Sequence, residues 1–199
     1  MEATDAAEMM DQERAENRFK KNAAILIGVL AMLLAITSLG SNNAMKEALN
    51  ENIIASNSYS FFQAKNIRQT GYLIAANELE LAWLNEPTLP PEARERLQAK
   101  LDDYRKTVER YESEPDTGEG KKELLAKARE HEANRDKALK QDPYFDYAEA
   151  LLQIAIVLVS VSIVADQRWL TLIAGGLGGV GLLLMLNGFL LFMTIPGLG

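Results

Sequence analysis

The sequence contains no cysteine and a single histidine, His131, among its 199 residues. The absence of cysteine excludes disulfides, thiolate catalysis and cysteine-based metal sites. His131 has no second imidazole with which to share a metal ion, so we interpret it as a solvated or packing residue rather than as a metal ligand or pH sensor. The sequence also lacks a serine nucleophile motif between strand and helix and a G-x-x-x-x-G-K-[ST] phosphate loop. We therefore expect no enzyme, no cofactor and no metal site.

The chain has no excess of basic residues. It contains 21 Lys and Arg against 28 Asp and Glu, for a formal net charge of −7. Nucleic-acid binding requires a basic surface, so no nucleic-acid partner is expected. The charges are concentrated in residues 1–21 and 41–143, whereas residues 144–199 contain only Asp146, Glu149, Asp166 and Arg168.

Three long apolar blocks occupy residues 23–39, 148–165 and 169–195. A helix needs about 20 apolar residues to cross the hydrocarbon layer of a bilayer. We predict transmembrane helices at 22–40, 144–166 and 169–195, the last two joined by a tight turn. A cleaved signal peptide is the alternative for the first block, because Lys20 and Lys21 precede it. A soluble helical hairpin is the alternative for the other two, but so short a chain could not cover them.

The distribution of positive charge predicts an orientation. Arg14, Arg18, Lys20 and Lys21 precede the first block, and Arg168 lies between the other two. Short loops rich in Lys and Arg stay on the cytoplasmic side, whereas long loops are discounted. We expect the polar N-terminal segment 1–21 in the cytoplasm and residues 41–143 in the periplasm, with the protein in a bacterial inner membrane.

Residues 41–143 have the pattern of a helical stalk. Proline and glycine divide them into helices at about 41–85, 91–112 and 119–140, and Asp142-Pro143 should break or kink the chain before the second span. Apolar residues at 97, 101, 104, 108 and 111 have coiled-coil spacing, and a thinner seam runs through 124, 128, 131, 135 and 138. The first helix would rise about 65 Å, as would the other two end to end. This predicts an antiparallel stalk, with a hairpin of the second and third helices against a bent first helix as the alternative. The predicted fold class is all-α.

Two stretches resemble a known family. They are NSYSFFQAKNIRQ at residues 57–69 and YFDYAEALLQIAIVLVSVSIV at residues 144–164. Both are similar to those of bacterial membrane proteins known only as the domain of unknown function 4337 family. The resemblance implies one N-terminal span, a helical middle and two C-terminal spans. It implies no activity, cofactor or site.

The third apolar block is rich in glycine. Gly175 and Gly179 form a G-x-x-x-G pair, which lets helix backbones approach closely in lipid. Folding the chain back at position 167 should set Gly175 opposite Val159 and Gly179 opposite Ala155. Three interpretations fit this pattern, namely packing of the second span on the third, oligomerisation, and a glycine-lined pore. The predicted packing residues are Ala155, Ala174, Gly175, Gly178 and Gly179.

Polar residues inside the apolar blocks need partners, because lipid offers none. We expect Asn187 to hydrogen-bond toward Asp146 or Glu149, and Gln153 to lie opposite Gly181. A proton or cation path through Asp146, Glu149, Gln153 and Asn187 is one interpretation. Packing and capping of helix starts is the interpretation we favour.

Two aromatic residues, Phe61 and Phe62, precede two basic residues, Lys65 and Arg68, within the first stalk helix. They could contact a protein partner or anionic lipid headgroups. The favoured interpretation is a stalk helix whose apolar stripe packs inward and whose bases are solvated.

These patterns together predict a non-enzymatic homo-oligomeric membrane protein. It would act as a scaffold or interaction partner, through its stalk, for other envelope or membrane proteins. The alternative is an oligomeric channel or transport subunit with a path lined by the second and third spans.

Overall fold

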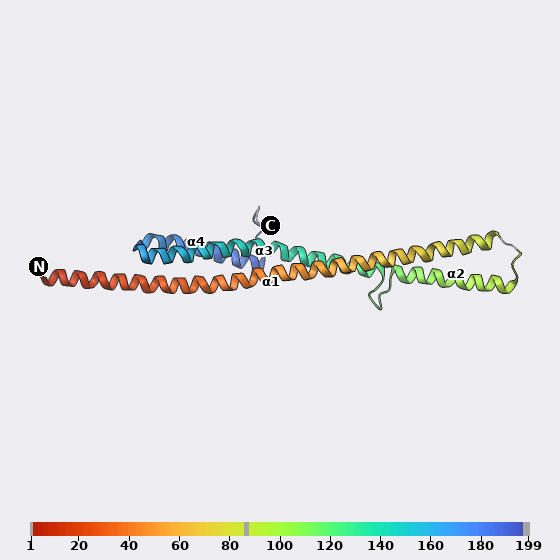
Figure 1. Cartoon of the computed structure of the whole chain (residues 1–199), viewed down its shortest axis with the longest axis horizontal. Coiled ribbons are helices and arrows are strands. Elements are labelled where there is room, and N and C mark those ends of the chain that lie inside the picture. The colour runs from red at the N-terminus through yellow and green to blue at the C-terminus, as the bar shows by residue number, and fades with distance from the viewer. Residues whose placement is uncertain (1, 86–87, 197–199) are drawn as a thin grey trace. The chain divides into compact units, whose positions relative to one another are not determined.

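The computed structural model describes residues 2–85 and 88–196, and its regular structure there is entirely helical. Within these residues, four helices follow one another (Figure 1), α1 (Glu2–Asn85), α2 (Pro91–Glu112), α3 (Lys121–Ala165) and α4 (Arg168–Leu190). No strand occurs in these described ranges, which confirms the all-α prediction. The chain divides into two compact units, residues 1–48 with 136–199 and residues 49–135.

Helix α1 is a single helix of 84 residues. The first proline of the chain is Pro87, just beyond the end of this helix, and the helix contains only three glycines. Proline and glycine are the residues that interrupt helices, so their scarcity explains its length. The expected stalk helix therefore continues directly from the first apolar block, and the polar N-terminal segment is helical as well.

Helix α2 begins and ends where the sequence predicts, with Pro91 in its first turn, where a missing N–H costs no hydrogen bond. Of the break or kink expected at Pro143, the break does not occur, because α3 runs through this proline without interruption. A proline inside a helix removes one backbone hydrogen bond. Tyr144 and Phe145 follow it directly and are each only 2% exposed. Their burial holds the helix together across Pro143.

Helix α4 ends at Leu190, earlier than the predicted end of the third span at 195. Leu191 takes a left-handed conformation with φ of 47°, and its N–H donates to the Asn187 carbonyl at 2.7 Å. This closes the last turn and directs the next residues away from the helix axis.

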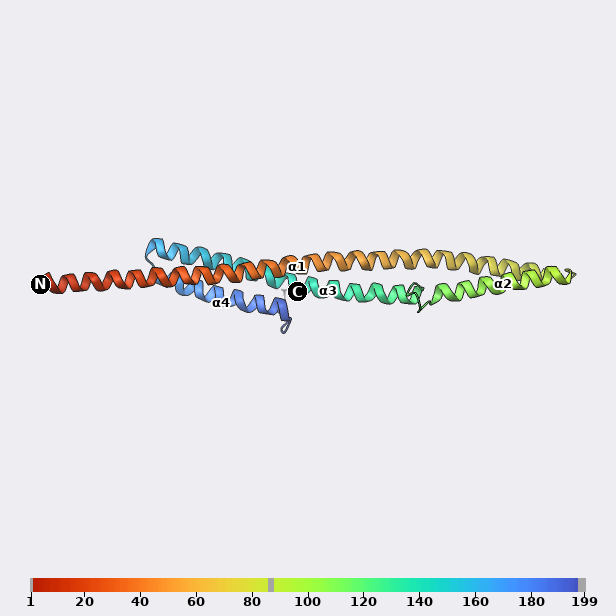
Figure 2. The same cartoon turned by 90° about the horizontal axis from the view of Figure 1, so that it is seen from below.

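The first unit packs the N-terminal part of α1 with residues 136–165 of α3 and with α4, which are seen above and below α1 in the view of Figure 2. Its core consists of small and aliphatic residues, namely Ala23, Leu30, Leu152, Ala155, Val159 and Ala174. The three helices of this unit are long and apolar enough to cross a membrane. The chain itself buries only 22%, 28% and 22% of the apolar stretches of α1, α3 and α4. Most of this apolar surface therefore requires other apolar surroundings.

The second unit packs α1 against α2 and the start of α3. Tyr72 of α1 contacts Tyr104 and Tyr111 of α2, with ring centroids 5.4 and 5.9 Å apart. Tyr59 of α1 donates to Glu132 of α3 at 2.7 Å. Residues earlier in α1 thus contact residues later in the chain, Tyr72 meeting Tyr104 and Tyr59 meeting Glu132. Helix α2 and then the start of α3 therefore run antiparallel to α1. This is the arrangement that the matched helix lengths predict, rather than the hairpin alternative.

Candidate functional site

Some of the small residues of α4 pack against other helices, whereas others are exposed. Ala174 and Gly178 are buried, and a Cβ added to Gly178 would lie 2.5 Å from Leu30 Cδ2 and 4.0 Å from Ala155 Cβ. Gly175 and Gly179 are exposed, and a Cβ added to either would have no neighbouring atom within 4 Å. The predicted pairing of these two glycines with Val159 and Ala155 is therefore wrong.

The register differs by one residue because of the turn before α4. Asp166 adopts a positive φ of 51°, and α4 begins at Arg168. One residue rotates a helix face by about 100°. The small-x-x-x-small pair one residue earlier, Ala174 and Gly178, therefore faces the neighbouring helices and forms the intrachain contact.

An aromatic ring that no sequence pattern indicates fills the space between α1 and α4. Phe145 of α3 is 2% exposed, and Cβ atoms added at Gly40 or Gly188 would lie within 3.0 Å of its ring. Phe189 packs edge-on against it, with ring centroids 4.8 Å apart. The two glycines, 148 positions apart in sequence, thus form the two walls of one aromatic slot. Their spacing carries no periodic signal that could have revealed it.

Asn187 holds the segment that follows α4. Its Nδ2 donates to the Met193 carbonyl at 2.8 Å, and the Met193 N–H donates to its Oδ1 at 3.0 Å. The Tyr144 hydroxyl accepts from the Ile195 N–H at 3.0 Å and lies 3.3 Å from the Met193 carbonyl. The expected bond from Asn187 to Asp146 or Glu149 is wrong, because the left-handed turn brings this backbone to the amide first.

Replacing Asn187 with leucine should destabilise the first unit by about 1–3 kcal/mol, because the Met193 N–H would lose its partner and the Met193 carbonyl would keep only the Tyr144 hydroxyl. Unfolding with a denaturing detergent from mild micelles measures this free energy. The neighbouring Leu186, 40% exposed, provides a control as Leu186→Ala. A loss of stability for Asn187→Leu no larger than that for Leu186→Ala would contradict a stabilising role of the two hydrogen bonds between Asn187 and Met193.

The other polar residues of the apolar blocks are not brought together into one path. Gln153 donates to Glu149 within α3 at 3.1 Å and is exposed. Asp146 lies 3.3 Å from the Ser41 hydroxyl of α1. Gln153 does not cover Gly181 as expected, because Leu152 and the Ala148 carbonyl lie there instead.

The aromatic and basic stretch of α1 divides between two faces of the helix. Phe62 and Lys65 point into the second unit, where Lys65 lies 3.6 Å from Glu114 and 3.5 Å from Glu119 and is 13% exposed. Lys121 lies over the Phe62 ring, 5.6 Å from its centroid. Helical spacing places Phe61 and Arg68 elsewhere, and both are exposed.

Gln69, four residues beyond Lys65, joins the three helices of the second unit. Its Nε2 donates to the Val108 carbonyl at 2.9 Å and to Glu112 at 3.1 Å, while Lys121 donates to its Oε1 at 2.7 Å. The bonds from Gln69 and Lys121 hold the pKa of the Glu112 carboxyl below its usual value. The inward part of this stretch thus anchors the turn between α2 and α3.

His131 forms an ion pair or hydrogen bond across the second unit. Its Nδ1 lies 2.6 Å from Glu51 Oε2, and the two side chains are only 20% and 14% exposed. Asn134 donates to the same oxygen at 3.3 Å. The histidine is thus a packing residue with a polar partner 80 positions away, which no local pattern indicates.

We expect the second unit to lose stability in acid. The hydrogen bond from His131 holds the pKa of Glu51 below its ordinary 4.5. The ionised carboxylate therefore stabilises the fold above about pH 4.5, and this contribution disappears as the pH falls through the lower, folded-state pKa. Thermal unfolding followed by circular dichroism from pH 7 to pH 3 should show a smaller acid-induced loss for Glu51→Gln than for the unmodified chain.

The matched control for this experiment is Glu109→Gln on the exposed face of α2. Its unfolding should follow that of the unmodified chain at every pH. Identical pH profiles for Glu51→Gln and Glu109→Gln would contradict the role of the Glu51–His131 pair.

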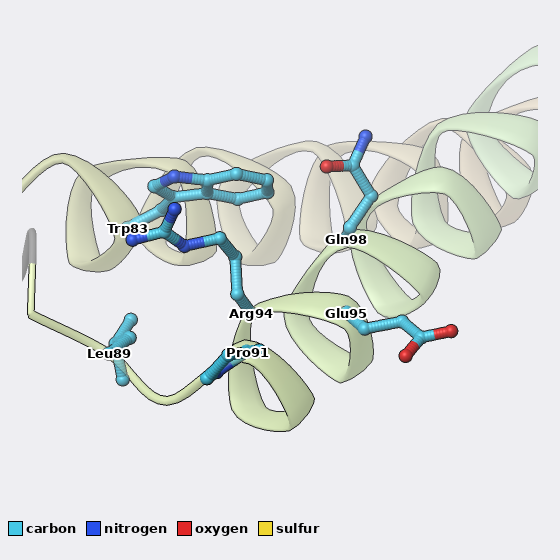
Figure 3. A pocket seen from close by; sticks show the side chains of 6 residues that line it. All are labelled: Trp83, Leu89, Pro91, Arg94, Glu95 and Gln98. Atoms are coloured by element: carbon cyan, nitrogen blue, oxygen red, sulfur yellow. The ribbon is translucent and has the colours of Figure 1, made fainter.

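The cavities of the second unit are open hollows. One of about 540 Å³ lies at the turn between α1 and α2 (Figure 3), where the Arg94 guanidinium lies beside the Trp83 indole and Glu95 points away. Another, of about 400 Å³, is lined by residues including Phe61 and Lys65. In the second hollow the Ser58 hydroxyl donates to the Ile54 carbonyl at 2.9 Å, and Lys65 is engaged by Glu114 and Glu119. Over residues 2–85 and 88–196, no group of three or more His, Asp or Glu side chains is placed to hold a metal ion.

The regular structure of residues 2–85 and 88–196 is thus all helical, with three helices there apolar enough to cross a membrane. The family model described as "Domain of unknown function (DUF4337)" matches residues 19–191. The chain belongs to this family, and both stretches that carried the resemblance supply packing residues, Gln69 in one and Phe145 in the other. No curated protein and no solved structure matches the chain.

Proposed function

We propose that this chain is a membrane-anchored, homo-oligomeric scaffold whose helical stalk binds other proteins of the bacterial envelope. The observation that carries this proposal is the continuity of α1, which contains both the apolar residues 23–39 and the stalk residues 49–85 in one helix. A continuous helix joins the stalk to its anchor without an intervening linker. A flexible linker would favour a tethered, independent domain instead.

The exposure of the apolar helices supports insertion into a bilayer. Val164 and Leu172 are 89% and 79% exposed, and Ile25 is 66% exposed. Exposing such side chains to hydrocarbon costs no free energy, whereas exposing them to water would drive aggregation. We propose that α1, α3 and α4 each cross the inner membrane once, with the N-terminus in the cytoplasm and the stalk in the periplasm.

Native mass in a mild detergent tests the homo-oligomeric part of the proposal. Light scattering corrected for bound detergent should give a whole multiple of the 22.0 kDa chain mass, at least twice that value, and particle images should show one stoichiometry. A monodisperse monomer at concentrations reached in the membrane would contradict the proposal.

A channel or transport subunit is the second candidate, and one observation favours it. Glu149 is partly exposed and Gln153 is exposed on α3, where they bond to each other. Surrounding lipid would offer neither side chain a further hydrogen-bond partner. In an oligomer these side chains could line a path. Ion flux into liposomes containing the protein should then fall with Glu149→Gln, and unchanged flux would remove this candidate.

A further inference from the structure

A second regular stripe runs along the stalk part of α1, on the face turned away from α2 and α3. We call it the outer stripe. Its positions follow one another in alternating steps of four and three residues, at 49, 53, 56, 60, 63, 67, 70, 74, 77, 81 and 84. All eleven positions are exposed. Six are large aliphatic residues that are 52–72% exposed, namely Leu49, Ile53, Ile67, Ile74, Leu81 and Leu84.

The contacts of the second unit use a different set of positions on the same helix. Glu51, Lys65, Gln69 and Tyr72 belong to an inner seam with the same alternating spacing, and their partners lie on α2 and α3. The outer stripe therefore takes no part in holding the unit together. Its regular spacing over about 54 Å of helix is the spacing by which one long helix packs along another.

The composition of the outer stripe differs from that of a solvated helix face. None of its eleven positions carries a charge, and the five that are not aliphatic are Ser, Thr, Asn or Gln. Helix α2, by contrast, exposes charged side chains at half of its 22 residues. A solvated face is normally charged, so the outer stripe has the character of a covered surface.

The absence of charge also indicates which partner covers it. Copies anchored by the same apolar segment of α1 would stand parallel, so each stripe residue would meet its own counterpart. A charged residue would then face a like charge, whereas Ser, Thr, Asn and Gln both donate and accept hydrogen bonds and can pair with themselves. Aliphatic residues at the remaining positions likewise match their own copies.

We propose that the outer stripe docks in parallel against the outer stripe of a second copy of this chain. The inference rests on the proposed homo-oligomer and names its contact surface in the stalk. It assigns the apolar residues of the stripe, with Ile67 and Ile74 near the middle, to the interface between copies.

Cysteine cross-linking tests this contact directly, because the natural chain contains no cysteine. In a parallel, in-register pair, the two copies of position 67 come within disulfide range. Mild oxidation of membranes containing Ile67→Cys should give mostly a covalent dimer of the chain. The control, Ala99→Cys on the exposed face of α2, should give little. A second variant, Ile67→Glu with Ile74→Glu, should lower the native mass in detergent, whereas Ala99→Glu should not.

The outcomes separate this inference from the proposed function. A monomeric unmodified chain would contradict the homo-oligomer and the stripe contact together. An oligomeric chain without the cross-link at position 67, and with native mass unchanged by the double glutamate variant, would overturn the stripe contact alone. A cross-link from position 67 only to a different protein would overturn it as well.

Discussion

Replacing Phe145 with alanine is expected to destabilise the first unit by about 3–5 kcal/mol, the range for removing a large buried aromatic side chain. The ring is 2% exposed and fills the slot between Gly40 and Gly188. Neither glycine has a side chain that could move into the vacated space, so the cavity would remain. Unfolding of the full chain with a denaturing detergent, followed by circular dichroism, measures the change.

The neighbouring ring provides the control for this substitution. Phe189 touches Phe145 but is 47% exposed, so Phe189→Ala removes surface that lipid or detergent can cover again. Its effect should be clearly smaller. If the two alanine variants unfolded alike, the slot would not be the main contact between these helices.

Filling the slot should be about as harmful as emptying it. In Gly188→Leu, the new Cβ would lie 2.8–2.9 Å from three atoms of the Phe145 ring. The ring has little room to retreat, because it is only 2% exposed and lies as close to Gly40 as to Gly188. Overpacking of this kind typically costs about 1–3 kcal/mol, and we expect the upper end. The same unfolding experiment measures it.

The same substitution at another glycine of α4 is the matched control. Gly179 has no atom within 4 Å of an added Cβ, so Gly179→Leu should leave the stability of the isolated chain unchanged. A loss of stability at Gly179 equal to that at Gly188 would contradict the register in which α4 packs. Such a result would instead favour the register predicted from the sequence, in which Gly179 lies opposite Ala155.

Local rules account for much of the fold. The scarcity of proline and glycine before Pro87 predicts a long first helix, and Pro91 marks the start of α2. The alternating spacing around Leu101 identifies the face of α2 that packs on α1. Each of these inferences depends on neighbours within a few turns of helix, which a sequence displays directly.

The features that escaped prediction depend on single torsion angles or on distant residues. The positive φ of Asp166 rotates α4, so Gly178 rather than Gly179 faces the core. The left-handed Leu191 ends α4 and gives Asn187 backbone partners. Pro143 stays helical because the burial of the residues after it outweighs one lost hydrogen bond.

The polar contacts of the second unit were beyond prediction for a related reason. Glu51 and His131 are separated by 80 positions, and each is surrounded by other polar residues that could have served as partners. Choosing between them requires the helix register, which the sequence constrains only to a face. The outer stripe could have been found from its spacing, but only its exposure distinguishes it from the inner seam.

The membrane-anchored stalk makes its sharpest prediction about the side of the membrane on which each segment lies. Single cysteines at Gln12, Gln98 and Gln167 can be probed in sealed cells with a maleimide that does not cross membranes, because the chain has no other thiol. We expect labelling at position 98 in the stalk, and at positions 12 and 167 only after the membrane is opened. Labelling of positions 98 and 167 from the same side would contradict a crossing by α3, and with it the membrane-anchored stalk.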